Sequence, residues 1–327
     1  MSNKIIREID KKITLNKKEI SQKTYSEFKI ILSAIQNQKD YLKLIFSSFE
    51  NLNIQEPKPQ TCPEAHKQFY IMSTLHSAYK YYEEIIDAII IGRYSVAYTL
   101  LRNLFEQWSV LSIIVRYNKL SEITDYNISN RRSKKDKLVS DIFLERIMQE
   151  PIIMQLWDYS CMDISPEIKK EKFRRKDLDI EDDKYYKFLQ KLFTPGNIRY
   201  ILGKDNADVK KIINYHYKLM SVYSHGIEFS RYSNDYQYLK TENTVVLFYG
   251  GDFNNAHAHF LLYKSYNLID LILYEIRGSQ LIKLPDGYTI YDKSIFDSME
   301  QYKYQNNITL DRFKLYNIFG DSFNIKK

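Results

Sequence analysis

Residues 78–108 read AYKYYEEIIDAIIIGRYSVAYTLLRNLFEQW, and this stretch decides the fold. Apolar side chains recur every three to four residues on both sides of Gly92, which is the spacing of one face of an α-helix. The pattern predicts one helix over 66–91 and a second over 94–117. Because the break at Gly92 is so short, we expect the two helices to pack as antiparallel neighbours.

Two further segments, 208–224 and 255–276, carry the same helical period and are expected to join this hairpin in one bundle. The charge-rich stretch between the hairpin and these segments is interpreted as a helical insertion. The predicted units are an N-terminal helical extension (1–64), a core helical bundle (65–118 and 207–278), the charged insertion (119–206) and a C-terminal tail (279–327).

One segment favours a β-strand. The residues TVVLFYGG at 244–251 are β-branched and aromatic and end in two glycines, and YQYLK at 236–240 can pair with them. The chain has nine Gly and seven Pro in 327 residues, too few for a turn-rich all-β fold. The predicted fold class is therefore mainly α, an antiparallel helical bundle with a charged helical insertion and a short β-hairpin.

The sequence indicates a soluble cytoplasmic protein with no membrane partner. It has no apolar run near the roughly 18–20 residues that cross a bilayer, and its charged start, MSNKIIREIDKK, lacks the apolar centre of a signal peptide. Cys62 and Cys161 are the only cysteines, which excludes a disulfide framework and a cysteine-rich zinc site. The absence of a phosphate-binding glycine loop, a Rossmann fingerprint and a nucleophile elbow sets those enzyme classes aside.

Two pairs of side chains at four-residue spacing are the candidate catalytic residues. Arg102 and Glu106 lie one turn apart on a helix with apolar flanks, and Ser221 and His225 lie one turn apart before Gly226. We expect the two helices to meet there, because unsatisfied charges among apolar residues are costly. Arg102–Glu106 could equally be an ordinary salt bridge within one helix.

His225 has two interpretations. An imidazole near neutral pH can act as a general acid or base, with Ser221 orienting it. A histidine at the end of a helix can also simply interact with the last carbonyl groups. A nucleophilic Ser–His pair is disfavoured, because two neighbours on one helix provide no oxyanion hole.

No metal or cofactor site is predicted. His257 and His259 are two residues apart and do not share a helix face, so even with Asp252 nearby they lack the usual ligand spacing.

Basic clusters in the insertion are the candidate nucleic-acid-binding residues. The formal charge of +7 leans mildly towards polyanions, although the many lysines and tyrosines also fit compositional drift in an AT-rich genome. The acidic run at 177–183 could instead fold back and neutralise the lysines. The proposed RNA contacts are Arg131, Arg132, Lys134, Lys135, Lys172, Arg174 and Arg175.

The elements LLRNLFE (100–106), SVYSHG (221–226) and TVVLFYGG (244–251) occur in an order that resembles a poorly characterised family of bacterial helical proteins. The likeness covers about 65–118 and 208–277. That family is similar in turn to the HEPN superfamily, the higher eukaryotes and prokaryotes nucleotide-binding helical bundles. The usual HEPN signature, an arginine and a later histidine with four to six residues between them, is missing, because Lys218, Leu219 and Met220 occupy those positions before His225.

The resemblance implies a dimeric, metal-independent ribonuclease of phage defence or of a toxin–antitoxin system. In that case Arg102, Glu106 and His225 act from separate helices on RNA, within a homodimer. The alternative is a non-enzymatic helical module that binds a partner protein or a nucleotide-like ligand, with the polar residues in a structural role.

Overall fold

The computed structural model describes residues 2–50, 63–119, 122, 149–154, 156, 214, 217, 218, 220, 221, 236–239, 244–247 and 253–306 of the 327-residue chain. Its helices are α1 (Ser2–Glu27), α2 (Lys29–Glu50), α3 (Pro63–Ile90), α4 (Tyr94–Arg116), α12 (Asn255–Ser279) and α13 (Lys293–Gln305). Two short strands, β1 (Tyr236–Leu239) and β2 (Thr244–Leu247), pair antiparallel, with Tyr236 opposite Leu247. The described part is mainly helical, as the sequence predicts.

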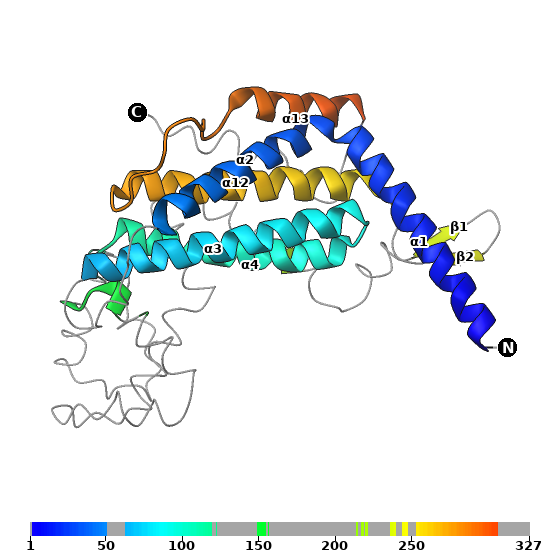
Figure 1. The fold of residues 1–327 in the computed structure, drawn as a ribbon, viewed down its shortest axis with the longest axis horizontal. Helices are drawn as coiled ribbons and strands as arrows, with labels where there is room; N and C mark the ends of the chain where they lie inside the picture. Colours follow the sequence, from blue (N-terminus) through cyan, green and yellow to red (C-terminus); the bar gives the residue numbers. More distant parts are fainter. Residues whose placement is uncertain are drawn as a thin grey trace.

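The hairpin predicted around Gly92 is formed by α3 and α4, which run antiparallel side by side (Figure 1). Gly92 has a φ of 75°, a left-handed conformation that glycine adopts without strain. Its N–H donates to Ile89 O at 3.0 Å, and the Arg93 N–H donates to Ala88 O at 2.8 Å. These two bonds form a Schellman cap, which ends α3 and reverses the chain within three residues.

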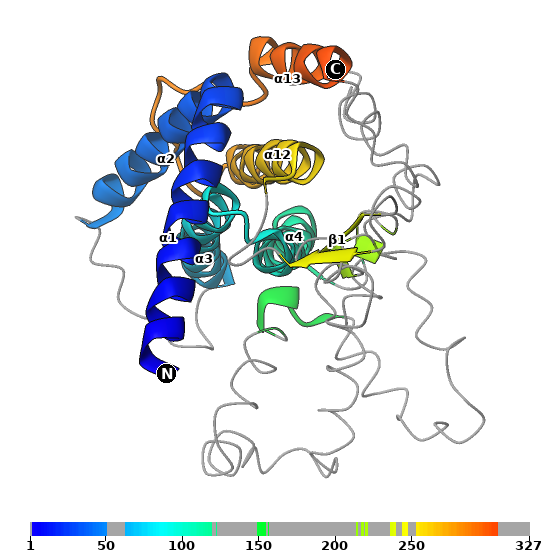
Figure 2. The same cartoon turned by 90° about the vertical axis from the view of Figure 1, so that its right-hand side faces the viewer.

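The most deeply buried helix is α12. Every residue over 257–273 is buried, because α12 lies between α13 on one side and the α3–α4 pair on the other (Figure 2). Asn254 begins the helix, its side-chain oxygen accepting a hydrogen bond from the His257 N–H at 3.1 Å. The helix extends beyond the predicted range of 255–276. The helix continues to Ser279, and Gln280 takes the left-handed conformation at its end.

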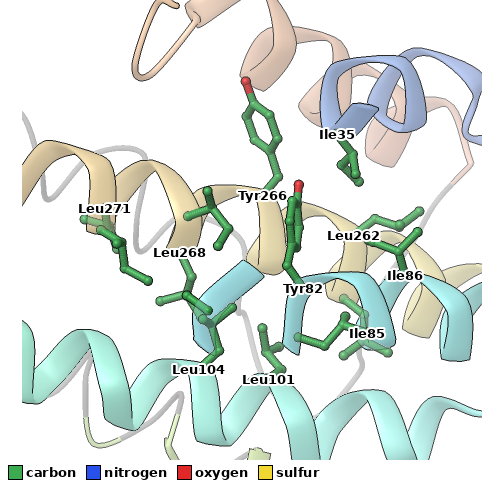
Figure 3. Packing of buried hydrophobic residues seen from close by; sticks show 14 of the residues in the cluster. Ile35, Tyr82, Ile85, Ile86, Leu101, Leu104, Leu262, Tyr266, Leu268 and Leu271 are labelled. Atoms are coloured by element: carbon green, nitrogen blue, oxygen red, sulfur yellow. The ribbon is translucent and has the colours of Figure 1, made fainter. Parts of the chain in front are cut away.

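The core lies mainly among four helices, and α13 adds Met299 to it. Side chains from α2, α3, α4 and α12 converge in it, and each large apolar side chain buried there contributes about 1.5–3 kcal/mol (Figure 3). Its members include Ile35, Tyr82, Ile85, Ile86, Leu101, Leu104, Leu262, Tyr266, Leu268 and Leu271.

The N-terminal helices α1 and α2 differ in their packing. α2 places Ile31, Ile35 and Leu42 in the core, whereas α1 runs outward past the end of the bundle (Figure 1). The two helices bend relative to each other at Phe28. Backbone hydrogen bonds continue through the bend, from Phe28 N to Thr24 O at 3.0 Å and from Leu32 N to Phe28 O at 2.9 Å.

The segment between α12 and α13 is fastened to the bundle by a buried carboxylate on α12. Asp270 accepts hydrogen bonds from Gln38 Nε2 at 2.8 Å, Tyr288 Oη at 2.8 Å and the Tyr291 N–H at 3.0 Å. Gln38 comes from α2, so a single carboxylate ties α2 and residues 288–291 to α12. Burial raises the pKa of Asp270 to about 6, and these hydrogen bonds oppose the rise.

Much of the predicted insertion and most of 208–224 lie outside the described residues. Two described pieces of the predicted insertion, one at Lys119 and one at Pro151, lie close together. Lys119 pairs with Pro151 in an antiparallel bridge, and the Ile152 N–H donates to Asn118 O at 2.8 Å. Within the described ranges, no helix has both the length and the apolar content needed to cross a bilayer.

Candidate functional site

Arg102 and Glu106 form the ion pair that their spacing on α4 predicts. Arg102 Nε donates to Glu106 Oε1 at 3.1 Å. The side chains are 22% and 32% exposed, so the pair lies at the edge of the bundle, neither in the core nor fully in solvent. A pair in this position is screened less than a surface pair and costs less to desolvate than a buried one.

A tyrosine from a distant part of the sequence completes the cluster. Arg102 Nη2 donates to Tyr217 Oη at 2.6 Å, and the guanidinium carbon lies 4.8 Å from the centre of the Tyr217 ring. The ring also lies 6.5 Å from that of Phe105. We call Arg102, Glu106 and Tyr217 the arginine cluster. It fixes the guanidinium from two sides, through its Nε and through one terminal nitrogen.

The expected contact between Arg102 and the segment that carries Ser221 is therefore made through Tyr217. Tyr217 is not one of the predicted site residues. It precedes Ser221 by four residues, and Ser221 precedes His225 by four, so the same spacing argument could have included it. Ser221 is half-buried and has a helical backbone conformation. His225 and the basic residues Arg131, Arg132, Lys134, Lys135, Lys172, Arg174 and Arg175 lie outside the described residues.

A small cavity adjoins the arginine cluster on the inner side of α4. It measures about 10 Å³, room for about one water molecule. Two of its lining residues, Leu101 and Phe105, flank Arg102 on α4, and a third, Met220, belongs to the segment that carries Tyr217. The rest of the lining comes from α12: Phe260, Lys264, Asn267, Leu268 and Leu271.

Lys264 contributes only the apolar part of its side chain to this cavity. It is 4% exposed, and its ammonium nitrogen lies 4.8 Å from the centre of the Tyr263 ring. Burial lowers the pKa of Lys264 to about 7; Glu300 opposes this shift and Lys303 adds to it. An amine with such a pKa is partly neutral at physiological pH and can accept a proton. A lysine inside an otherwise apolar helical stretch was the sequence signal for it.

The two histidines on α12 serve the packing of the helix. His257 Nδ1 lies 3.0 Å from Tyr98 Oη on α4, and His259 Nε2 lies 3.0 Å from Met299 O on α13. Burial lowers the pKa of each to about 4, so both are neutral at pH 7. In the part of the chain that the structure describes, no group of three or more His, Cys, Asp or Glu side chains could hold a metal ion.

Comparisons with protein families, curated proteins and solved structures identify no relative of this chain. The chain matches no family model, and neither the curated proteins nor the solved structures contain a match.

Proposed function

We propose that this chain is a HEPN-like helical protein that cleaves RNA without a metal ion, as an effector of phage defence or of a toxin–antitoxin system. The observation that supports this most is the arginine cluster. A guanidinium held by Glu106 and Tyr217 at the edge of a rigid hairpin is oriented before any ligand arrives. Pre-oriented donors of this kind are what a phosphodiester requires of a metal-free site.

In this proposal Arg102 binds the non-bridging oxygens of the scissile phosphate. Glu106 keeps the guanidinium oriented. His225, a base near neutral pH, takes the proton from the ribose 2′ hydroxyl, and the 2′ oxygen forms a bond to phosphorus. The bond from phosphorus to the 5′ oxygen breaks, and that oxygen takes up a proton. The products are a 2′,3′-cyclic phosphate and a free 5′ hydroxyl.

The rest of the proposal concerns binding. The basic residues of the insertion, such as Lys172 and Arg174, contact the RNA backbone, which makes affinity fall with salt. The chain acts as a homodimer, as the family resemblance implies.

A second candidate is a non-enzymatic module that binds a protein or a nucleotide-like ligand. One observation favours it, because Glu106 and Tyr217 already pair with Arg102 within the chain. In that case the cluster holds the 208–224 segment on α4 and has no part in chemistry.

The test is cleavage of labelled single-stranded RNA and of bulk tRNA by the purified chain in excess EDTA. We expect cyclic-phosphate ends from the wild type, and a loss of about 100-fold or more in rate for Arg102→Ala, as for other groups that stabilise transition-state charge. His225→Ala should be equally impaired. Arg93→Ala is the matched control, since Arg93 is an exposed arginine just before α4.

Three outcomes would reject the ribonuclease and leave the binding module. These are no cleavage by the wild type, cleavage that EDTA abolishes, and equal rates for Arg102→Ala and Arg93→Ala.

A further inference from the structure

α2 has a second stripe of mostly apolar side chains, which is exposed at its two ends and reaches the core at Ala34 and Tyr41. Ile30, Ala34, Asn37, Tyr41 and Leu44 follow alternating spacings of four and three residues, which is the spacing of a coiled-coil seam. The ends of the stripe are open to solvent, since Ile30 is 61% exposed and Leu44 is 47% exposed. Ala34 and Tyr41, in the middle of the stripe, are buried in the same core as Ile31, Ile35 and Leu42.

This stripe forms one wall of a groove of about 1030 Å³. Residues 286–295 form the other wall, and Tyr266 of α12 lies at its base. Within it the rings of Tyr41 and Tyr288 stack with their centres 4.7 Å apart and their planes within 17°. Small-molecule pockets commonly measure about 300–1000 Å³ and enclose their ligand. A long groove of this size on a helix surface is better matched to a peptide.

The second wall, residues 286–295, is held in place by hydrogen bonds to α12 and α2. Tyr288 and Tyr291 are bonded to Asp270, and Tyr41 Oη donates to Pro285 O at 2.7 Å. Tyr291 has a φ of 60°, a left-handed conformation that a tyrosine keeps only when its surroundings fix it. The groove is therefore largely formed before a ligand binds, which reduces the entropic cost of binding.

The charges that line the groove are mainly negative. Asp40, Asp286 and Asp292 line it against the single cation Lys29, in a chain whose formal charge is +7. Lys43 lies 3.8 Å from Asp40, but both side chains are more than half exposed, so this pair neutralises little. A partner with basic residues beside its apolar stripe is complementary to such a lining.

We propose that this groove binds an amphipathic helix of a partner protein, with apolar residues on one face and Lys or Arg on both flanks. Ile30 and Leu44 are fourteen positions apart in the numbering, and at about 1.5 Å per residue they lie about 21 Å apart along α2. A partner helix of about four turns spans that distance. Helix-in-groove recognition uses anchors at this spacing.

A second copy of the chain is a poorer occupant of the same groove. A two-fold interface brings the same patch of both copies together. Here that arrangement brings together two linings that both carry Asp40, Asp286 and Asp292, and like charges facing each other cost affinity. The interaction is also independent of RNA cleavage, because the groove lies on the α2 side of α12 and contains none of the arginine cluster.

The test is a fluorescence anisotropy titration of the full chain with labelled synthetic helices. One peptide of about 15 residues carries leucines at the seam spacing with lysines beside them, and its counterpart carries glutamates in place of the lysines. We expect the lysine peptide to bind at least about tenfold more tightly than the glutamate peptide. Ile30→Asp with Leu44→Asp should weaken it by about tenfold or more. Leu15→Asp, on exposed α1, is the matched control and should bind as the wild type does.

The double variant Asp40→Asn with Asp286→Asn should bind the lysine peptide more weakly than the wild type does. The difference in affinity between the lysine and glutamate peptides should also become smaller. Circular dichroism melts show whether each variant is folded. If Ile30→Asp with Leu44→Asp unfolds the chain, the variant Asp40→Asn with Asp286→Asn still tests the groove. Equal binding to the wild type and to both groove variants would overturn the proposal. Sedimentation of the unliganded chain as a dimer, with a monomer for Ile30→Asp and Leu44→Asp, would also overturn it in favour of a second copy.

Discussion

Tyr217 contacts Arg102 in two ways, through a 2.6 Å hydrogen bond to its hydroxyl and through a ring whose centre lies 4.8 Å from the guanidinium. The two residues are 115 positions apart in the chain. Hydrogen bonds to charged groups contribute about 1.5–3 kcal/mol and cation–π contacts about 0.5–1 kcal/mol at partly exposed sites. The pair therefore fastens the segment around Tyr217 to α4, whatever else the arginine does.

A double-mutant cycle measures this link. Tyr217→Phe removes the hydroxyl and keeps the ring, and we expect it to lower the free energy of unfolding by about 1 kcal/mol, since the site is partly solvated. Arg102→Ala should cost somewhat more, and the double variant less than the sum, with a coupling of about 1 kcal/mol. Urea unfolding at pH 7 gives these values. Strict additivity of the two changes would show that the bond contributes nothing.

Asp270 makes stability depend on pH in the acidic range. Burial raises its pKa to about 6 from an ordinary value of 3.8. Between these values the folded state binds more protons than the unfolded state, so the stabilising contribution of Asp270 is greatest below pH 4 and is lost as pH rises through 6. The contribution of this group is up to about 3 kcal/mol.

Asp270→Asn is the variant that isolates this effect. We expect the difference in unfolding free energy between wild type and variant to change with pH over the range from about 4 to 7 and to level off above it. Chemical unfolding at several pH values checks this. A difference that stays constant with pH would mean that Asp270 titrates normally.

Lys264 makes stability depend on pH in the opposite direction to Asp270. Its folded pKa of about 7 lies below its ordinary value of 10.5, so the unfolded state binds more protons between these values. Stability should therefore rise with pH, by about 2 kcal/mol from pH 7 to pH 9. Lys264→Met should lose this rise. If the variant and the wild type show parallel pH profiles, the ammonium is not desolvated as the structure indicates.

Tyr82 and Tyr288 form a matched pair for the hydroxyl group. The hydroxyl of Tyr82 is buried with no hydrogen-bond partner among the described residues, whereas that of Tyr288 donates to Asp270 at 2.8 Å. We expect Tyr82→Phe to be neutral or to stabilise the chain by up to about 1 kcal/mol, because it removes an unsatisfied polar group. Tyr288→Phe should destabilise it by about 1–3 kcal/mol. Thermal or urea unfolding distinguishes the two, and an equal loss in both would contradict the assignment.

The local elements were predictable because their signals are local. The apolar period marks α3, α4 and α12 within a few residues, and Gly92 marks the reversal between the first two. The Arg102–Glu106 pair also follows from a four-residue spacing within one helix. Each of these needs only neighbours in the sequence.

The partners across the fold were not predictable in the same way. Periodicity shows that a helix face is buried but not what covers it, so the contact of Arg102 with Tyr217 and that of Gln38 with Asp270 had no sequence signal. For the same reason the part of α2 in the core could not be recognised within the 1–64 segment. Lys264 was visible as a single lysine among apolar residues, yet only its neighbours in space give it a lowered pKa.

The bend at Phe28 has a mechanical consequence. The Phe28 ring lies 5.0 Å from that of Tyr302 on α13 and 6.2 Å from that of His259 on α12, so these two helices hold α1 at the point where it joins α2. α1 has 26 residues, and at about 1.5 Å per residue it is about 39 Å long. When α1 rotates as a rigid helix, Phe28 is the pivot. A rotation of about 10° at that ring displaces the far end by about 7 Å, so a small repacking around α12 is magnified at the start of the chain.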